Sequence, residues 1–364
     1  MEHRPELDGI RAIALLVVIG FHAGIHPAQG GWIAVDVFFV LSGYLITQIA
    51  INEHARRGSV NKRNFWIRRL LRLFPAVLVT LTFGLFFYKI LGDDGTFLGY
   101  LRSAGAVLGY VENFVWVATD HVHGQFGHTW SLGVEMQFYL VWPTVLIWLL
   151  AKGKRLEPVI ITGIVISYGL FLLQSTPHPV SVGMFPDAYY LPWTRAFELL
   201  TGALLAVRLT QRTAESRQRP GKHWIGWLIG FGFGVALLVN WSYYSIIVTP
   251  RVIVWQSPIA VLLTVALMIH LDRVRANGVG KFLAWKPVAW LGLVSYGVYL
   301  FHLPVISILE AKTDIPQGKE MFLAALPITL LLASFSYYVF EKPAQQLARR
   351  LTRPVVPATP QPID

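Results

Sequence analysis

Arg11 and His22 lie eleven positions apart on one strongly apolar segment, where a simple membrane anchor would need neither of them. Eleven residues at about 100° each complete nearly three helical turns, so the two side chains share one helix face about 16 Å apart along the axis. If the segment spans a bilayer, a fixed cation lies near one surface and a titratable imidazole lies in the other half. This arrangement favours chemistry inside a membrane, because ionisable groups at that depth are costly and commonly functional.

The composition indicates a polytopic integral membrane protein. Of 364 residues, 54% are hydrophobic and only 14% are charged, and long apolar runs recur along the whole chain. Residues 1–11 are charged and no cleavage site follows the first apolar run, so we expect the first helix to be retained. The chain has no cysteine, which excludes disulfides, thiolate metal sites and a cysteine nucleophile.

Hydropathy divides the chain into eleven apolar segments, of which ten are predicted to span the membrane. The segment at 97–118 carries Arg102, Glu112 and Asn113, so we expect it to be re-entrant, interfacial or packed against other helices. The predicted fold class is therefore an all-α membrane helix bundle of about ten helices. It forms one integral-membrane domain over 1–351, followed by a Pro-rich disordered cytoplasmic tail at 352–364.

The distribution of Lys and Arg predicts how the bundle is oriented. With the N-terminus inside, the predicted cytoplasmic stretches hold 25 of the 31 Lys and Arg residues, as the positive-inside rule requires. Both termini are then cytoplasmic, in a bacterial inner membrane. This topology accounts for most of the formal charge of +11, so no nucleic-acid partner is expected.

The loop at 52–72 is more basic than topology alone requires. Arg69 and Arg72 are i,i+3 neighbours on one predicted helix face, directly after Arg68. Guanidinium groups match phosphate oxygens with two parallel hydrogen bonds, so the loop predicts a site for a polyphosphate ligand. The alternative is an anchor that contacts anionic lipid.

Polar side chains also recur within the apolar segments. Asp36 lies about one turn from the outer end of the second segment. Ser131, Glu135 and Tyr139 follow one another at i,i+4 spacing, which makes a polar stripe on an otherwise apolar helix. Such a stripe must face protein or water rather than lipid.

Two further segments carry polar groups at helical spacing. Arg195 and Glu198 are i,i+3 neighbours, and mutual neutralisation is the role we favour for the pair. Ser295, Tyr299 and His302 line up on one face of a later helix, with His302 toward the outer end.

Three histidines precede Ser131 in a predicted outer stretch, at 121, 123 and 128. Their spacing, HVHGQFGH, matches no strong zinc pattern. No metal site is therefore predicted.

Seven stretches, in order and covering nearly the whole chain, carry a resemblance. They are RPELDGIRAIALLVVIGFH at 4–22, GGWIAVDVFFVLSGYLIT at 30–47, FWIRRLLRLFP at 65–75, WSLGVEMQFYLVWP at 130–143, TRAFELLTGALLA at 194–206, LGLVSYGVYLFHLP at 291–304 and SFSYYVFEKPAQ at 334–345. Together they resemble acyltransferase family 3, whose members are membrane-bound enzymes that transfer acetyl or other acyl groups to sugars, lipids and secondary metabolites.

The resemblance implies a ten-helix bundle that binds acyl-CoA on its cytoplasmic side and acylates a hydroxyl group, usually at the outer face. We expect a stand-alone form, without the SGNH hydrolase-like domain of some relatives. The family's Arg/Lys-x10-His, Arg-x-x-Arg and Ser-x-x-x-Glu motifs fall, in that order, on Arg11 and His22, on Arg69 and Arg72, and on Ser131 and Glu135.

On this interpretation His22 is a general base or the acyl acceptor, and the sequence does not separate the two. Asp36 or Glu135 would orient the imidazole ring, as the third member of a triad does, and Ser131 joins this catalytic group. The phosphates of acyl-CoA are expected to bind Arg11, Arg68, Arg69 and Arg72. The acceptor is expected to contact Tyr139, Arg195, Tyr299 and His302. Acyl-CoA, with acetyl-CoA expected, is then a co-substrate, and no tightly bound cofactor is predicted.

A cell-envelope glycan or glycolipid is the first candidate acceptor, and a secondary metabolite such as a macrolide is the second. The main rival class is a proton-coupled transporter, because ionisable groups inside a bundle also describe an ion path. That class would leave the basic loop at 52–72 unexplained, and the two halves show no inverted repeat. A non-catalytic sensor or scaffold would not need the spacing of Arg11 and His22.

Overall fold

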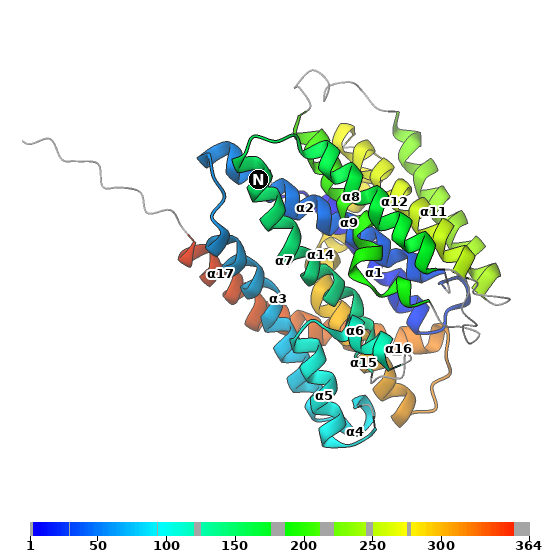
Figure 1. Ribbon diagram of the computed structural model, residues 1–364. Helices are drawn as coiled ribbons and strands as arrows, with labels where there is room; N and C mark the ends of the chain where they lie inside the picture. Colours follow the sequence, from blue (N-terminus) through cyan, green and yellow to red (C-terminus); the bar gives the residue numbers. More distant parts are fainter. Residues whose placement is uncertain are drawn as a thin grey trace, which may run out of the picture.

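The computed structural model describes residues 3–28, 30–92, 94–119, 125–175, 186–211, 222–244, 250–274 and 278–352. Within these ranges the regular structure is entirely helical, so the predicted all-α bundle is confirmed (Figure 1). The predicted tail lies, apart from its first residue, outside the described residues. The helices are α1 (Pro5–His22), α2 (Ala34–Arg57), α3 (Lys62–Leu85), α4 (Tyr88–Leu91), α5 (Phe97–Leu108), α6 (Glu112–Ala118), α7 (Trp130–Ala151), α8 (Leu156–Gln174), α9 (Pro192–Thr210), α11 (His223–Tyr244), α12 (Pro250–Arg273), α13 (Val279–Leu283), α14 (Lys286–Leu293), α15 (Ser295–Lys312), α16 (Lys319–Ser336) and α17 (Lys342–Leu351).

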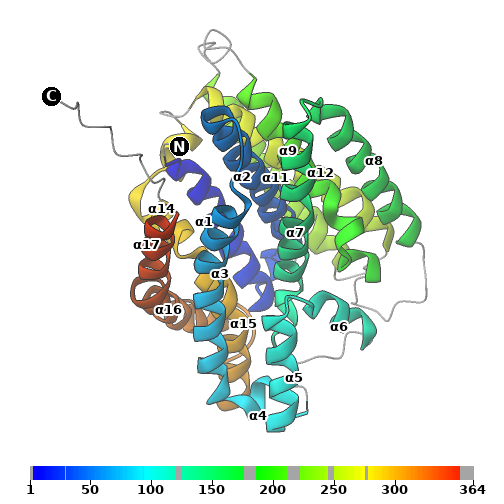
Figure 2. The same cartoon turned by 60° about the vertical axis from the view of Figure 1, so that its left-hand side comes forward.

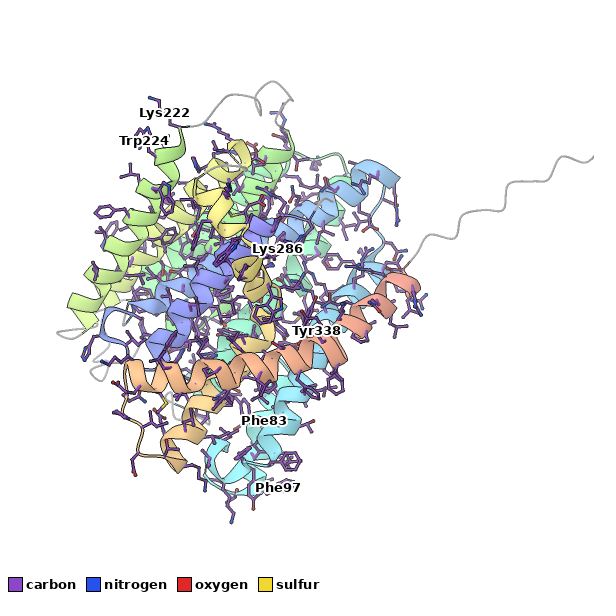
Figure 3. All side chains as sticks on the ribbon, turned by 180° about the vertical axis from the view of Figure 1, so that it is seen from behind. Phe83, Phe97, Lys222, Trp224, Lys286 and Tyr338 are labelled. Carbon is purple, nitrogen blue, oxygen red and sulfur yellow. The ribbon has the colours of Figure 1, made fainter. Side chains whose placement is uncertain are left out.

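By length and composition, five helices of the described residues are apolar enough to cross a membrane, or six if the bent pair α14 and α15 is one span. The segment at 97–118 forms the short helices α5 and α6, which agrees with its exclusion from the predicted spans. Large apolar side chains cover the outer surface, among them Trp224, Phe97 and Tyr338 (Figure 3). The number ten and the cytoplasmic position of the termini stay predictions.

Helices α2 and α9 pack so closely that their backbones touch. A Cβ atom added at Gly43 would lie 1.8 Å from the carbonyl oxygen of Leu199, and one added at Gly202 would lie 2.0 Å from that of Val40. Small residues at such crossings are typical of membrane bundles, where van der Waals packing replaces the hydrophobic effect. On its other side α9 packs along α8, and Figure 1 shows these helices beside α11 and α12.

The hairpin between α2 and α3 brings the basic loop against its own helices. Gly58 ends α2 in the left-handed conformation, with φ at 69°, which glycine adopts without a steric penalty. Asn61 then caps α3, since its side-chain oxygen accepts a hydrogen bond from the Asn64 amide at 2.9 Å. Glu53 of α2 contacts Arg68 of α3 at 2.9 Å, which ties the two helices together across this turn.

A sharp bend sets the position of α15. Helices α14 and α15 meet at an angle of 70°, so α15 starts at Ser295 in a new direction. Just before the bend, Gly292 lies against the Asp8 backbone of α1, where an added Cβ would be 1.9 Å from the carbonyl oxygen. Helix α1 thus lies in the middle of the bundle, in contact with α2, α14 and α15 (Figure 2).

Two matched glycine-to-alanine substitutions test the close crossing of α2 and α9. We expect Gly43→Ala to lower the melting temperature in detergent by several degrees, because overpacking costs about 1–3 kcal/mol. Gly169→Ala on α8 adds the same methyl group where nothing lies within 4 Å, so it should leave stability equal or slightly higher. Thermal unfolding followed by fluorescence compares the two, and equal melting temperatures would contradict the packing.

Candidate active site

A small cavity of about 90 Å³ lies between α1, α2, α3, α7 and α15, and we call it the inner cavity. It brings together seven of the residues predicted from sequence to form the site. Its polar lining consists of Arg11, Ser42, Arg69, Arg72, Ser131, Glu135, Tyr139, Ser295, Tyr296 and Tyr299.

Glu135 is the acidic group of the inner cavity. Ser42 of α2 and Tyr139 of α7 both donate hydrogen bonds to the same carboxylate oxygen. Tyr139 also lies under the Arg69 guanidinium, which is 4.9 Å from its ring centroid. The predicted polar stripe of α7 therefore faces protein, and Tyr139 contacts a cation with its ring and a carboxylate with its hydroxyl.

The arginines of the inner cavity outnumber its carboxylates. Arg11 contacts Asp8 of its own helix at 3.1 Å, and Glu135 lies near Arg69. The ion pairs formed by the described residues include neither Arg69 nor Arg72, although Arg69 is only 7% exposed. The cavity is consequently an electropositive environment suited to an anionic ligand.

A second and larger cavity, of about 530 Å³, lies beside the inner cavity, and we call it the basic pocket. Among the described residues that line it, Glu53 is the only acidic one, and it contacts Arg68 at 2.9 Å and Arg57 at 3.6 Å. Arg69 and Arg72 line both the basic pocket and the inner cavity. The two spaces are therefore neighbours that share these two side chains as part of their walls. The arginines of the basic pocket are Arg56, Arg57, Arg68, Arg69, Arg72 and Arg349.

His22 is the last residue of α1 and lies next to His302 of α15. It lies beyond the end of the inner cavity that is farther from the basic pocket. Its Nδ1 atom lies 3.0 Å from the Val18 carbonyl oxygen and 3.2 Å from Nε2 of His302. The His302 ring is in turn 5.0 Å from the ring of His128, measured between centroids. Three imidazoles from distant parts of the chain thus form one cluster.

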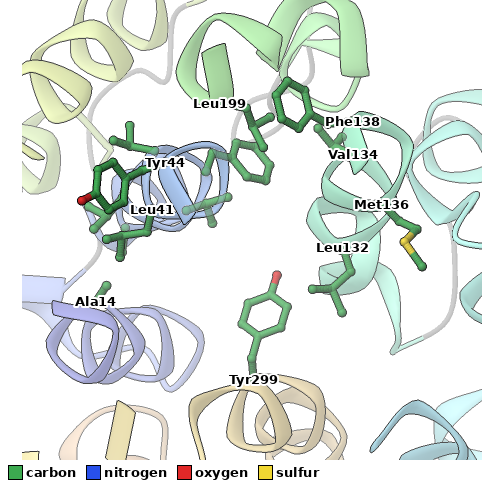
Figure 4. Close-up of a cluster of buried hydrophobic side chains, with 14 of the residues drawn as sticks. Ala14, Leu41, Tyr44, Leu132, Val134, Met136, Phe138, Leu199 and Tyr299 are labelled. Carbon is green, nitrogen blue, oxygen red and sulfur yellow. The ribbon is translucent and has the colours of Figure 1, made fainter. Parts of the chain in front are cut away.

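The pair Ser131 and Tyr299 stands between the inner cavity and this histidine cluster. Their hydroxyl oxygens are 2.6 Å apart, and the Tyr299 hydroxyl donates to the His128 carbonyl oxygen, also at 2.6 Å. Figure 4 shows the Tyr299 side chain pointing from α15 into the space between α2 and α7. The centroid of the Tyr299 ring lies 5.4 Å from that of the His302 ring. Tyr299 therefore stands between the inner cavity and the histidine cluster.

The structure corrects two placements made from sequence. Asp36 lies against Arg195 rather than against His22, and Arg195 is completely buried rather than part of the inner cavity. The reason is the cost of a buried charge, which a guanidinium offsets only with counter-charges in contact. Glu198 is the second counter-charge, and its contact with Arg195 at 3.2 Å is the one expected from their i,i+3 spacing.

Sequence reasoning missed three groups that the fold brings to the site. Ser42 and Arg349 come from helices whose facing partners no local pattern reveals, while His128 was considered only as a metal ligand. Within the described residues, no group of three or more acidic or histidine side chains is arranged to hold a metal ion. His121 and His123 lie outside these residues.

Comparison with known proteins identifies the family. The sequence profile described as "Acyltransferase domain" matches residues 4–340. YrhL of Bacillus subtilis is 32% identical over 355 residues, which cover 93% of this chain and 54% of that relative. The peptidoglycan O-acetyltransferase OatA of Listeria monocytogenes is also 32% identical, over 94% of this chain and 56% of its own.

The O-acetyltransferase OatA of Staphylococcus aureus is again 32% identical, over 94% of this chain and 57% of its own length. The chain thus spans a little over half the length of these relatives. No solved structure matches it. The profile covers more than nine-tenths of the chain and confirms the resemblance drawn from its seven stretches, and the chain belongs to acyltransferase family 3.

Proposed function

We propose that this chain is an O-acyltransferase that transfers an acyl group from acyl-CoA to a hydroxyl group of a cell-envelope glycan. The observation that carries the proposal is that Arg69 and Arg72 line both the basic pocket and the inner cavity. A ligand with phosphates at one end and a reactive acyl group at the other fits two spaces joined in this way. The printed name of the Listeria relative, a peptidoglycan O-acetyltransferase, supports a glycan acceptor.

The basic pocket suits the nucleotide end of acyl-CoA. Its volume of about 530 Å³ falls within the range of about 300–1,000 Å³ that is typical of small-molecule sites. Arg56 and Arg349 offer phosphate contacts from different helices, and Arg68 is already held by Glu53. The pantetheine arm then passes Arg69 and Arg72 and enters the inner cavity, where Arg11 adds a further positive charge.

His22 supplies the reacting nitrogen in this proposal. A carbonyl oxygen can only accept a hydrogen bond, so the contact of Nδ1 with the Val18 carbonyl leaves Nε2 free to take a proton. The acceptor oxygen bonds to the acyl carbon, its proton passes to Nε2, and the carbon–sulfur bond breaks to release CoA as a thiolate. The thiolate then takes up this proton from Nε2, which restores the neutral imidazole. In the acyl-imidazole route the same atom carries the acyl group first.

The acyl group reaches His22 past Ser131 and Tyr299, whose hydroxyl groups contact each other at that point. We propose that the basic pocket opens to the cytoplasm, where acyl-CoA is made. Residues of the 52–72 loop and of α17 both line the pocket, so these two basic segments share one side of the molecule. That shared side agrees with the positive-inside distribution of charge.

Removal of one phosphate ligand tests the donor site. We expect Arg69→Ala to raise the Kd for acyl-CoA about 10- to 100-fold, because hydrogen bonds to charged groups contribute about 1.5–3 kcal/mol. The Kd of Arg69→Lys should fall between the values for the wild-type protein and Arg69→Ala, because lysine keeps the charge but lacks the planar guanidinium group. Calorimetric titration in detergent measures Kd, with Arg102→Ala on the exposed face of α5 as the matched control. Unchanged affinity in Arg69→Ala would place the donor elsewhere.

Removal of the imidazole tests the reacting group. We expect His22→Ala to lower kcat by about 10²- to 10⁴-fold, the usual range for loss of a general base, while the Kd for acyl-CoA changes little. Transfer is measured in proteoliposomes as acceptor-dependent release of free CoA. Near-normal release by the variant would contradict the assignment of His22. If neither the wild-type protein nor His22→Ala releases CoA, the proposed acyltransferase activity is contradicted.

A further inference from the structure

Two acceptors face Nδ1 of His22, the Val18 carbonyl oxygen and a second histidine that nothing in the proposed reaction yet uses. His302 lies on α15, 280 residues after His22, and is completely buried. Its Nδ1 atom is 2.6 Å from the Tyr299 carbonyl oxygen. Because that oxygen can only accept, Nδ1 of His302 carries the hydrogen.

This contact fixes the direction of the hydrogen bond between the two rings. With the hydrogen on Nδ1, the neutral His302 ring presents a lone pair at Nε2. That atom faces Nδ1 of His22 at 3.2 Å, and Nδ1 of His22 carries a hydrogen because it also contacts the Val18 carbonyl oxygen at 3.0 Å. His22 is therefore the donor, and Nε2 of His302 shares its one Nδ1 hydrogen with the Val18 carbonyl oxygen as a second acceptor.

We propose that His302 is the positioning residue of His22: its neutral imidazole holds the ring in the tautomer with a free Nε2 and accepts from the imidazolium that forms during transfer. This inference rests on the proposed function and assigns the orienting role of a triad's third member to an uncharged group. The acceptor contact predicted from sequence for His302 is replaced by a contact with the base itself.

The carboxylates expected to orient His22 are engaged elsewhere. Asp36 is in contact with Arg195, and Glu135 accepts hydrogen bonds from Ser42 and Tyr139. His302 is thus the side chain whose acceptor atom faces His22 in the described structure. The ring of His128, itself buried, packs edge-on against His302 with an interplanar angle of 80° and fixes its orientation from the other side.

Two substitutions at His302 test its role as a hydrogen-bond acceptor separately from its role in packing. His302→Leu fills the space without an acceptor, so we expect kcat to fall about 10²-fold or more while the KM for acyl-CoA stays within about twofold. His302→Gln offers an amide oxygen at similar reach and should recover most of the lost kcat. Ser307→Ala is the matched control, because it removes a partly buried hydrogen bond, to Gln125, from the same helix without touching His22.

The tautomer can also be measured without turnover. In protein labelled with ¹⁵N-histidine, the ring nitrogens of His22 should report a protonated Nδ1 and a bare Nε2, and His302→Leu should convert this signal to a mixture of tautomers. Wild-type kcat and an unchanged His22 signal in His302→Leu would overturn the inference, as would equal loss of kcat in the Leu and Gln variants with donor binding intact. Absence of acyl transfer by the wild-type protein, with the predicted ¹⁵N signals present, would instead refute the proposed function.

Discussion

A completely buried arginine holds together the helices that carry the site. Arg195 of α9 contacts Asp36 at the start of α2, Glu198 on its own helix and, at 3.2 Å, the Ser257 hydroxyl of α12. The loss of one partner from such a cluster typically costs about 3–5 kcal/mol, because a charge is left uncompensated. Four aromatic rings surround its guanidinium, with centroids at 4.4 to 6.0 Å: Tyr189, Phe39, Phe171 and Trp130. The cluster therefore ties α2 to the start of α7, and these two helices supply Ser42, Ser131 and Glu135 to the inner cavity.

The distribution of charge in the basic pocket differs from that in the cluster around Arg195. Around Arg195 the cation is matched by carboxylates in contact, whereas the basic pocket holds six arginines and one acidic residue. Arginines left without counter-charges repel one another, and this arrangement costs stability that the rest of the bundle must supply. The cluster around Arg195 is accordingly structural, and we propose that the arginines of the basic pocket without counter-charges bind the anionic part of the ligand.

Local spacing in the sequence was sufficient where all partners share one helix. The common face of Ser131, Glu135 and Tyr139 and the proximity of Arg69 to Arg72 follow from helical periodicity, and these residues do line one cavity. Contacts between helices were not predictable in this way. Asp36 was one of two carboxylates expected to orient His22, yet helical periodicity does not say which helices are neighbours, and α2 packs chiefly on α9.

The same limit explains one group and one contact that sequence reasoning missed. Arg349 reaches the basic pocket only because α17 packs along α3, and His302 meets His22 only because the 70° bend before α15 directs that helix across α1. The all-α membrane bundle itself was predictable, since apolar runs of sufficient length have few alternatives in a bilayer. The number of spanning helices was less so, because charged helices such as α1 and α3 belong to the bundle without meeting a simple hydropathy test.

The central claim is that one donor molecule occupies both cavities and passes between them at Arg69 and Arg72. The most direct measurement is a cryo-electron microscopy structure in lipid nanodiscs with a thioether analogue of acyl-CoA, which cannot transfer its acyl group. The account predicts that the phosphates lie in the basic pocket within hydrogen-bond distance of Arg69 or Arg72, with the pantetheine arm in the inner cavity and its end toward Ser131 and Tyr299. Phosphates bound at another surface, or an arm that lies outside the inner cavity, would contradict it.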